Sequence, residues 1–102
     1  MKSTVVRYQV KPGRGDENQQ LVEKVFAELH ERQTAGVRYA TFRLDDGVTF
    51  VHIATNDSDD GPNPLGSLTA FAEFQAEIAD RCEVQPLALG AKVVGSYRLL
   101  AD

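Results

Sequence analysis

His52 is the side chain best suited to acid–base chemistry in this sequence. It stands between Phe50 and Ala54, and in an extended strand these two residues and Asn56 share its face. A neutral imidazole that faces an aromatic-lined space can accept a proton from a phenol. A core or interface histidine satisfied by one hydrogen bond fits the same pattern, so both interpretations stay open.

Tyrosines and one arginine offer further polar groups. Tyr8, Tyr39 and Tyr97 fall in three different predicted strands. Each phenol joins a flat apolar ring to a hydrogen-bonding tip, which can position an aromatic ligand. Arg98 could stabilise an enolate or a carboxylate. Half-buried packing for the tyrosines and an outward salt bridge for the arginine are the alternatives.

Other reactive groups do not form a recognisable site. Asp57, Asp59 and Asp60 crowd one loop, but they lack the calcium-binding pattern Asp-x-Asp-x-Asp-Gly with a distant Glu, so we expect solvated carboxylates and no metal. The stretch Pro12-Gly13-Arg14-Gly15 lacks the Lys-Ser/Thr ending of a phosphate loop. Cys82 is the single cysteine, which excludes an internal disulfide and favours a packed thiol.

Composition excludes several classes of protein. The net charge of -4 argues against a nucleic-acid groove, which needs a basic stripe, and against docking on an anionic membrane. No run approaches the roughly 20 apolar residues of a membrane span. The chain therefore predicts one soluble, cytoplasmic domain over residues 1–102.

The first half of the chain begins with a predicted strand and helix. The strand covers residues 4–10, where one face carries Thr, Val, Tyr and Val. A helix starts near Asp16, with Gln19 three residues later as in a capping box. It fades by Gly36, since glycine commonly ends helices.

A hairpin follows this helix. Strands are predicted over residues 37–44 and 48–55, joined by Asp45-Asp46-Gly47, because an Asp-Gly pair suits a tight turn. The glycines, prolines and short polar residues of segment 56–67 oppose any regular element. This loop is long for a small domain and could act as a lid.

A second helix and a last strand complete the chain. The helix is predicted over residues 68–81, with Ser67 or Thr69 as its cap, and Pro86 ends its helical character. The last strand is predicted over residues 91–100. The order strand, helix, strand, strand, helix, strand predicts an α+β fold. Its four-stranded antiparallel sheet has the order 4-1-3-2, with both helices on one face.

The face of the sheet away from the helices should meet water unless something covers it. Val51 and Ile53 on the third strand are apolar on the face opposite Phe50. The last strand is apolar on both faces, with Val93, Tyr97 and Leu99 on one and Val94 and Leu100 on the other. Both faces are therefore expected to be covered, and a second copy of the same sheet in a homodimer is the simplest cover.

Several stretches are similar to one known family. They are Val5-Val6-Arg7-Tyr8, Lys11-Pro12-Gly13, Gly36-Val37-Arg38-Tyr39, Phe50-Val51-His52-Ile53-Ala54 and Phe71-Ala72-Glu73-Phe74. In these stretches the chain resembles the antibiotic biosynthesis monooxygenase-like domains of the dimeric α/β-barrel superfamily. The resemblance implies a ferredoxin-like fold that pairs into a dimeric barrel, with a pocket between sheet and helices in each subunit.

The resemblance also implies an activity. It suggests a monooxygenase without cofactor that acts on a small aromatic, polyketide or quinol-like molecule, with His52 as the base. The substrate-binding candidates are Tyr8, Tyr39, Phe50, Asn56, Phe71 and Phe74. The chain departs from the family in two ways. Asn56 stands about where many members have a tryptophan, and the first strand lacks the asparagine that the haem-degrading members use, so we do not expect haem degradation. A non-catalytic small-molecule-binding homodimer and a scaffold with a filled pocket are the alternatives.

Overall fold

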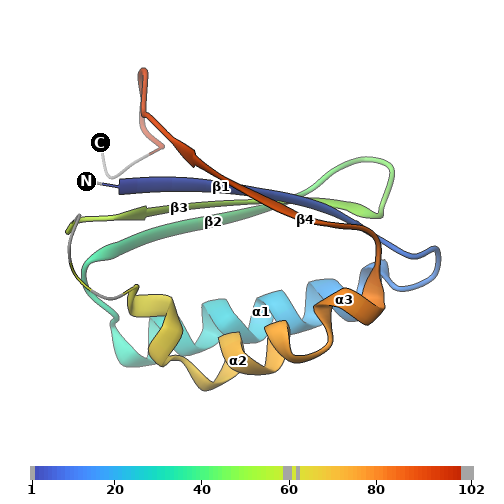
Figure 1. Ribbon diagram of the computed structural model, residues 1–102. Coiled ribbons are helices and arrows are strands. Elements are labelled where there is room, and N and C mark those ends of the chain that lie inside the picture. Colours follow the sequence, from blue (N-terminus) through green and yellow to red (C-terminus); the bar gives the residue numbers. More distant parts are fainter. Residues whose placement is uncertain (1, 59–60, 62, 100–102) are drawn as a thin grey trace.

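The computed structural model describes residues 2–58, 61 and 63–99, which form one antiparallel sheet with its helices on one face (Figure 1). The strand order is β2-β3-β1-β4, which confirms the predicted order 4-1-3-2. The elements are β1 (Lys2–Val10), α1 (Gly15–Arg32), β2 (Val37–Arg43), β3 (Thr49–Asn56), the 3₁₀ turn η1 (Pro64–Ser67), α2 (Thr69–Ala76), α3 (Ile78–Arg81) and β4 (Cys82–Ala91).

The core lies between the sheet and the helices. Alternation along β1 and β3 turns Tyr8, Val10 and Phe50 toward α1, where Val22 and Val25 meet them. Full burial of each such side chain stabilises the fold by roughly 1.5–3 kcal/mol before entropy costs. This packing fixes the inner face of the sheet, and His52 lies on the same face as Tyr8 and Phe50.

The N-terminus of the first helix is held by a contact with the sheet and not by a side-chain cap of its own. The predicted capping box is wrong, because α1 starts at Gly15 and no side chain caps its end. Instead Asp16 Oδ1 and Gln19 Oε1 accept hydrogen bonds from Arg43 Nη1 of β2, at 2.9 and 2.7 Å. The two side chains that the capping-box pattern assigned to the helix N-terminus therefore bind Arg43 of the sheet instead.

The second helix differs from its prediction in the same way. It is broken at Glu77 into α2 and α3, and neither Ser67 nor Thr69 caps it. The Glu28 carboxylate of α1 accepts from Thr69 N at 3.2 Å and from Ala70 N at 2.8 Å. These bonds lower the pKa of Glu28 and lock the two helices together.

The predicted last strand over residues 91–100 is wrong. The strand β4 runs over Cys82–Ala91 and includes Pro86, which lies on an edge strand where proline costs less in lost hydrogen bonds. Residues 92–99 form no strand, so Val93, Val94, Tyr97 and Leu99 lie outside the sheet, and Leu100 falls outside the described residues. The outer face of β4 instead carries Leu87 and Leu89, opposite Arg7 and Val5 of β1.

The loop after β3 is more regular than predicted. It contains η1, where Asn63 Oδ1 accepts from Leu65 N and Leu65 is buried. The hairpin between β2 and β3 is confirmed, with Gly47 at φ 79°. None of the described helices is both long and apolar enough to cross a membrane.

Candidate functional site

A cavity of about 180 Å³ lies between the inner face of the sheet and α2. Its ring walls are Tyr8 from β1, Tyr39 from β2, His52 from β3, and Phe71 and Phe74 from α2. Amide side chains from Asn56, Asn63 and Gln75 also reach the lining. The cavity is therefore a mainly aromatic space with a few polar groups, which is the usual character of a small-molecule site.

Strand register brings the polar ring atoms of this site together. Thr41 lies directly opposite His52 across the β2–β3 pair, and Tyr8 is its diagonal neighbour on β1. His52 Nε2 is 2.7 Å from the Tyr8 hydroxyl. His52 Nδ1 is 2.6 Å from the Tyr39 hydroxyl and 2.9 Å from Thr41 Oγ1. Both ring nitrogens are thus engaged within the protein.

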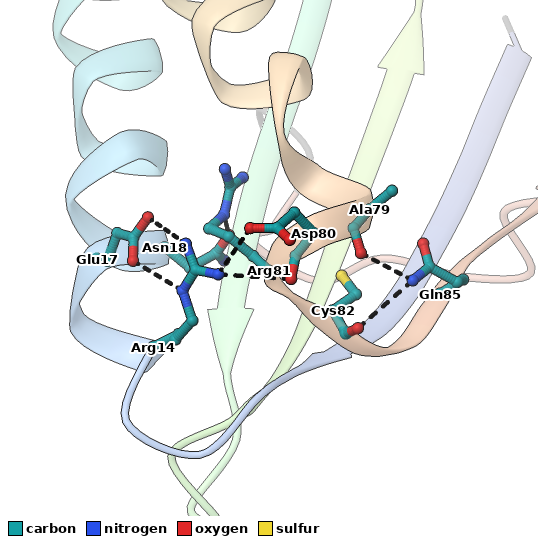
Figure 2. Close-up of polar contacts among 8 residues, drawn as sticks. All are labelled: Arg14, Glu17, Asn18, Ala79, Asp80, Arg81, Cys82 and Gln85. Carbon is teal, nitrogen blue, oxygen red and sulfur yellow. Dashed lines mark hydrogen bonds and ion pairs between the residues drawn. The ribbon is translucent and has the colours of Figure 1, made fainter.

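A second layer extends this network into the core. Asn18 of α1 donates from Nδ2 to the Tyr8 hydroxyl at 2.8 Å. Arg81 of α3 donates from Nε to Asn18 Oδ1 at 3.1 Å and from Nη2 to the Phe74 carbonyl at 2.7 Å. Figure 2 shows Asn18 and Arg81 side by side where the start of α1 meets the end of α3. Arg81 is only 1% exposed, so its charge lies inside the fold.

Burial sets the protonation of these groups. Loss of solvent lowers the pKa of His52 to about 4, because it penalises the charged imidazolium. The same cause raises the pKa of Tyr39 to about 12 and the pKa of Tyr8 well above its usual value. At neutral pH the site therefore holds a neutral imidazole between two protonated phenols.

Asn56 carries an unused polar atom at the cavity. Its Oδ1 is buried and has no hydrogen-bond partner among the described residues, and the residue lines the cavity. An unpaired buried acceptor costs roughly 1–3 kcal/mol. A ligand with a hydroxyl or amine would remove that cost.

The structure brings most of the predicted site residues together. His52, Tyr8, Tyr39, Asn56, Phe71 and Phe74 all line the cavity. Phe50 does not line it and lies behind Tyr8, with ring centroids 5.7 Å apart. Tyr97 and Arg98 lie beyond β4, away from the cavity.

Sequence reasoning missed Asn18, Thr41 and Arg81. Asn18 stands on the inner side of α1, one turn before Val22, and a polar residue there is a usable signal of a buried bond. Thr41 could have been found from strand pairing opposite His52. No feature of the sequence indicated that Arg81 is buried, because an arginine near a helix end is usually exposed.

Metal ligands do not gather in the described part of the chain. No group of three or more His, Cys, Asp or Glu side chains there could hold an ion. Asp57 is exposed, while Asp59 and Asp60 fall outside the described residues.

The sequence matches no family model and no curated protein. Solved structures are similar in fold. A putative antibiotic biosynthesis monooxygenase from Nitrosomonas europaea has a TM-score of 0.78 at 13% identity, covering 93% of this chain and 100% of that one. A putative antibiotic biosynthesis monooxygenase from Caulobacter crescentus has a TM-score of 0.71 at 18% identity, covering 92% and 90%.

A mutant of SnoaB, a cofactor-independent oxygenase from Streptomyces nogalater, has a TM-score of 0.69 at 15% identity, covering 95% of this chain and 96% of that one. These identities are low, so the likeness concerns the backbone. The chain has the ferredoxin-like fold of the antibiotic biosynthesis monooxygenases.

Proposed function

We propose that this chain is a cofactor-independent monooxygenase of a small aromatic, quinol-like substrate, in which His52 is the base that allows the substrate hydroxyl to ionise. The observation that carries the proposal is the buried His52 imidazole in the wall of an aromatic cavity, bonded to two phenols that line the same cavity. A fold neighbour described as a cofactor-independent oxygenase supports it.

The chemistry needs no group beyond the substrate and oxygen. Loss of the hydroxyl proton leaves an electron-rich oxyanion that can react with O₂. One oxygen atom enters the ring and the other leaves as water, while the substrate supplies the electrons, so a hydroquinone would become a hydroxyquinone. The apolar walls shield the anion from water.

The volume of the cavity limits the size of the substrates that it can hold. A cavity of about 150 Å³ holds one benzene ring, and the cavity here measures about 180 Å³. A single-ring quinol or phenol fits this space, whereas a three-ring polyketide or anthrone would have to project out of it. The Asn56 acceptor suits one of the hydroxyl groups.

A non-catalytic small-molecule-binding protein is the second candidate. Both nitrogens of His52 are occupied, and protonation at pH 7 of a ring with a pKa of about 4 costs about 4 kcal/mol. An oxyanion formed in the cavity would offset part of this cost by Coulomb attraction. The scaffold alternative is less favoured, because the pocket is not filled by side chains.

Oxygen uptake tests the proposal. We would supply single-ring hydroquinones and phenols, two-ring quinols and three-ring anthrones to the wild type, to His52→Ala and to His30→Ala. His30 is an exposed histidine on α1 and serves as the matched control. We expect the largest uptake with single-ring compounds, a loss of at least about 100-fold in His52→Ala, and no change in His30→Ala.

Other outcomes separate the candidates. Equal uptake by the wild type and His52→Ala would remove His52 from the mechanism. Single-ring compounds that bind, as seen by calorimetry, without any oxygen uptake would favour the binding protein.

We further propose that the chain forms a homodimer through the outer face of its sheet. That face is mostly apolar, with Leu87 and Leu89 about 60% exposed. The chain after β4 rises on the same side, away from the helices (Figure 1). Exposed apolar patches of this kind mark interaction surfaces. The other apolar members of the face are Val5, Ala40, Phe42, Val51, Ile53 and Val84.

A further inference from the structure

We infer that Tyr8 is the group that takes the proton from the bound ligand, and that Asn18 and Arg81 are positioning residues that fix the direction in which Tyr8 passes a proton to His52 Nε2. The role in turnover rests on the proposed function. The arrangement of protons in the resting protein does not, and it can be measured without any substrate.

The direction is set at Arg81. A guanidinium has only donors, so the Asn18 atom that faces Arg81 Nε at 3.1 Å must be the amide oxygen. The second bond of Arg81, to the Phe74 carbonyl, holds the guanidinium in place. Asn18 is fully buried and cannot turn its amide without losing this bond. Its NH₂ group therefore faces Tyr8.

The next two bonds follow from this orientation. The Tyr8 oxygen accepts from Asn18 Nδ2 at 2.8 Å, and His52 Nε2, at 2.7 Å, is the one acceptor that the described residues offer to the Tyr8 hydroxyl hydrogen. A neutral imidazole has one donor and one acceptor nitrogen. Since Nε2 accepts, Nδ1 carries the ring proton and shares it between the oxygens of Tyr39 and Thr41.

Among the described residues, one path then leads from the cavity to the unprotonated nitrogen of the imidazole. The Nδ1 side already bears a proton, so Tyr39 cannot pass one to the ring. Tyr8 lines the cavity and donates to Nε2, so it connects the ligand with the one basic nitrogen.

The transfer balances as a proton relay. The O–H bond of the ligand breaks, and its proton forms a new bond to the Tyr8 oxygen. The original Tyr8 proton leaves that oxygen and bonds to His52 Nε2. The result is a ligand oxyanion and an imidazolium, with Tyr8 again a neutral phenol and no change in oxidation state.

Ring ¹⁵N NMR of histidine in the full-length protein tests the inference directly. Protonated and bare ring nitrogens resonate in separate regions, and His30→Gln identifies the signals of the only other histidine. We expect His52 of the wild type to be the Nδ1–H tautomer at pH 7. An Nε2–H tautomer there would overturn the inference, whatever any variant does.

Asn18→Asp is the decisive variant. The carboxylate keeps the shape of the side chain and can pair with Arg81, but it has no donor. Tyr8 should then donate to the carboxylate and accept from Nε2, so the tautomer should invert to Nε2–H. Tyr39→Phe is the matched control, because Thr41 remains as an acceptor and the Nδ1–H form should persist. A folded Asn18→Asp protein that keeps the wild-type tautomer would contradict the role of Asn18.

Discussion

At the scale of single residues, the polar groups of the site differ in their hydrogen bonds: some have a partner for every polar atom, and one has an acceptor left over. His52 is 4% exposed and has partners on both nitrogens, whereas the Asn56 side-chain oxygen has no hydrogen-bond partner in the described part of the chain. Buried polar groups without partners lower stability, so they persist where a ligand needs them. We therefore expect a ligand to contact the side of the cavity that Asn56 lines.

The buried imidazole predicts a loss of stability in mild acid. Below pH 6.5 the unfolded chain protonates His52, whereas the folded chain does so only near pH 4. The unfolded state thus binds the additional proton in this window, and the free energy of unfolding falls as the pH decreases, by about 3 kcal/mol in total. Urea unfolding at pH 7, 6, 5 and 4, at one protein concentration, measures it.

The matched variants isolate this effect. His30→Ala should keep the full acid dependence, and His52→Gln should lose this part of it. If His52→Gln and the wild type lose stability equally between pH 7 and 5, the imidazole is not the cause.

Asn56→Leu is predicted to trade function for stability. The leucine removes the unpaired acceptor, so the free energy of unfolding should stay the same or rise by roughly 1 kcal/mol. Binding of a single-ring hydroquinone should weaken about tenfold, the loss of one hydrogen bond. Calorimetry and urea unfolding check the two halves, and binding of wild-type strength in the variant would show that Asn56 does not contact the ligand.

At the scale of elements, the close approach of α1 to the hairpin controls the geometry of the site. A Cβ on Gly15 would lie 2.3 Å from the Gly47 carbonyl oxygen and 2.3 Å from Arg43 Nη2. The Arg43 side chain can move aside at little cost, whereas a shift of the Gly47 backbone carbonyl is costly. Gly15 therefore sets how near α1, and with it Asn18, comes to the sheet.

Gly15→Ala is expected to lower the free energy of unfolding by roughly 1–3 kcal/mol, the usual cost of overpacking. Gly66→Ala in η1 is the control, since a Cβ there meets nothing within 4 Å. Thermal unfolding of both variants measures the difference. Equal melting temperatures would mean that the hairpin moves aside without cost.

At the scale of the whole molecule, the uncovered face of the sheet predicts the assembly. An interface of about 800 Å² per partner is usual for a stable complex. Leu87→Glu places a charge on that face and should convert a dimer into a monomer, as measured by light scattering after size exclusion. Ala27→Glu on the exposed surface of α1 should remain dimeric. A monomeric wild type at micromolar concentration would reject the homodimer.

The order of elements and the two faces of the first strands followed from the sequence alone. A side-chain period of 2 is a local property of a strand, so Tyr8 and Val10 could be placed on one face of the first strand, and Phe50 and His52 on one face of the third, before any contact was known. Six residues of the cavity lining, among them Tyr8, Tyr39 and His52, were also named from the sequence, and the family resemblance supplied the expectation of a pocket between sheet and helices.

Only the tertiary structure decided where β4 begins, what caps α2 and how His52 is held. Pro86 opposes a strand by local rules, and an edge position that no local pattern reveals makes it acceptable. Glu28 replaces the expected cap from 41 residues away. Arg81 meets Asn18 across 63 residues of sequence. Such contacts depend on how elements pack against one another, and a local pattern of residues carries no record of that packing.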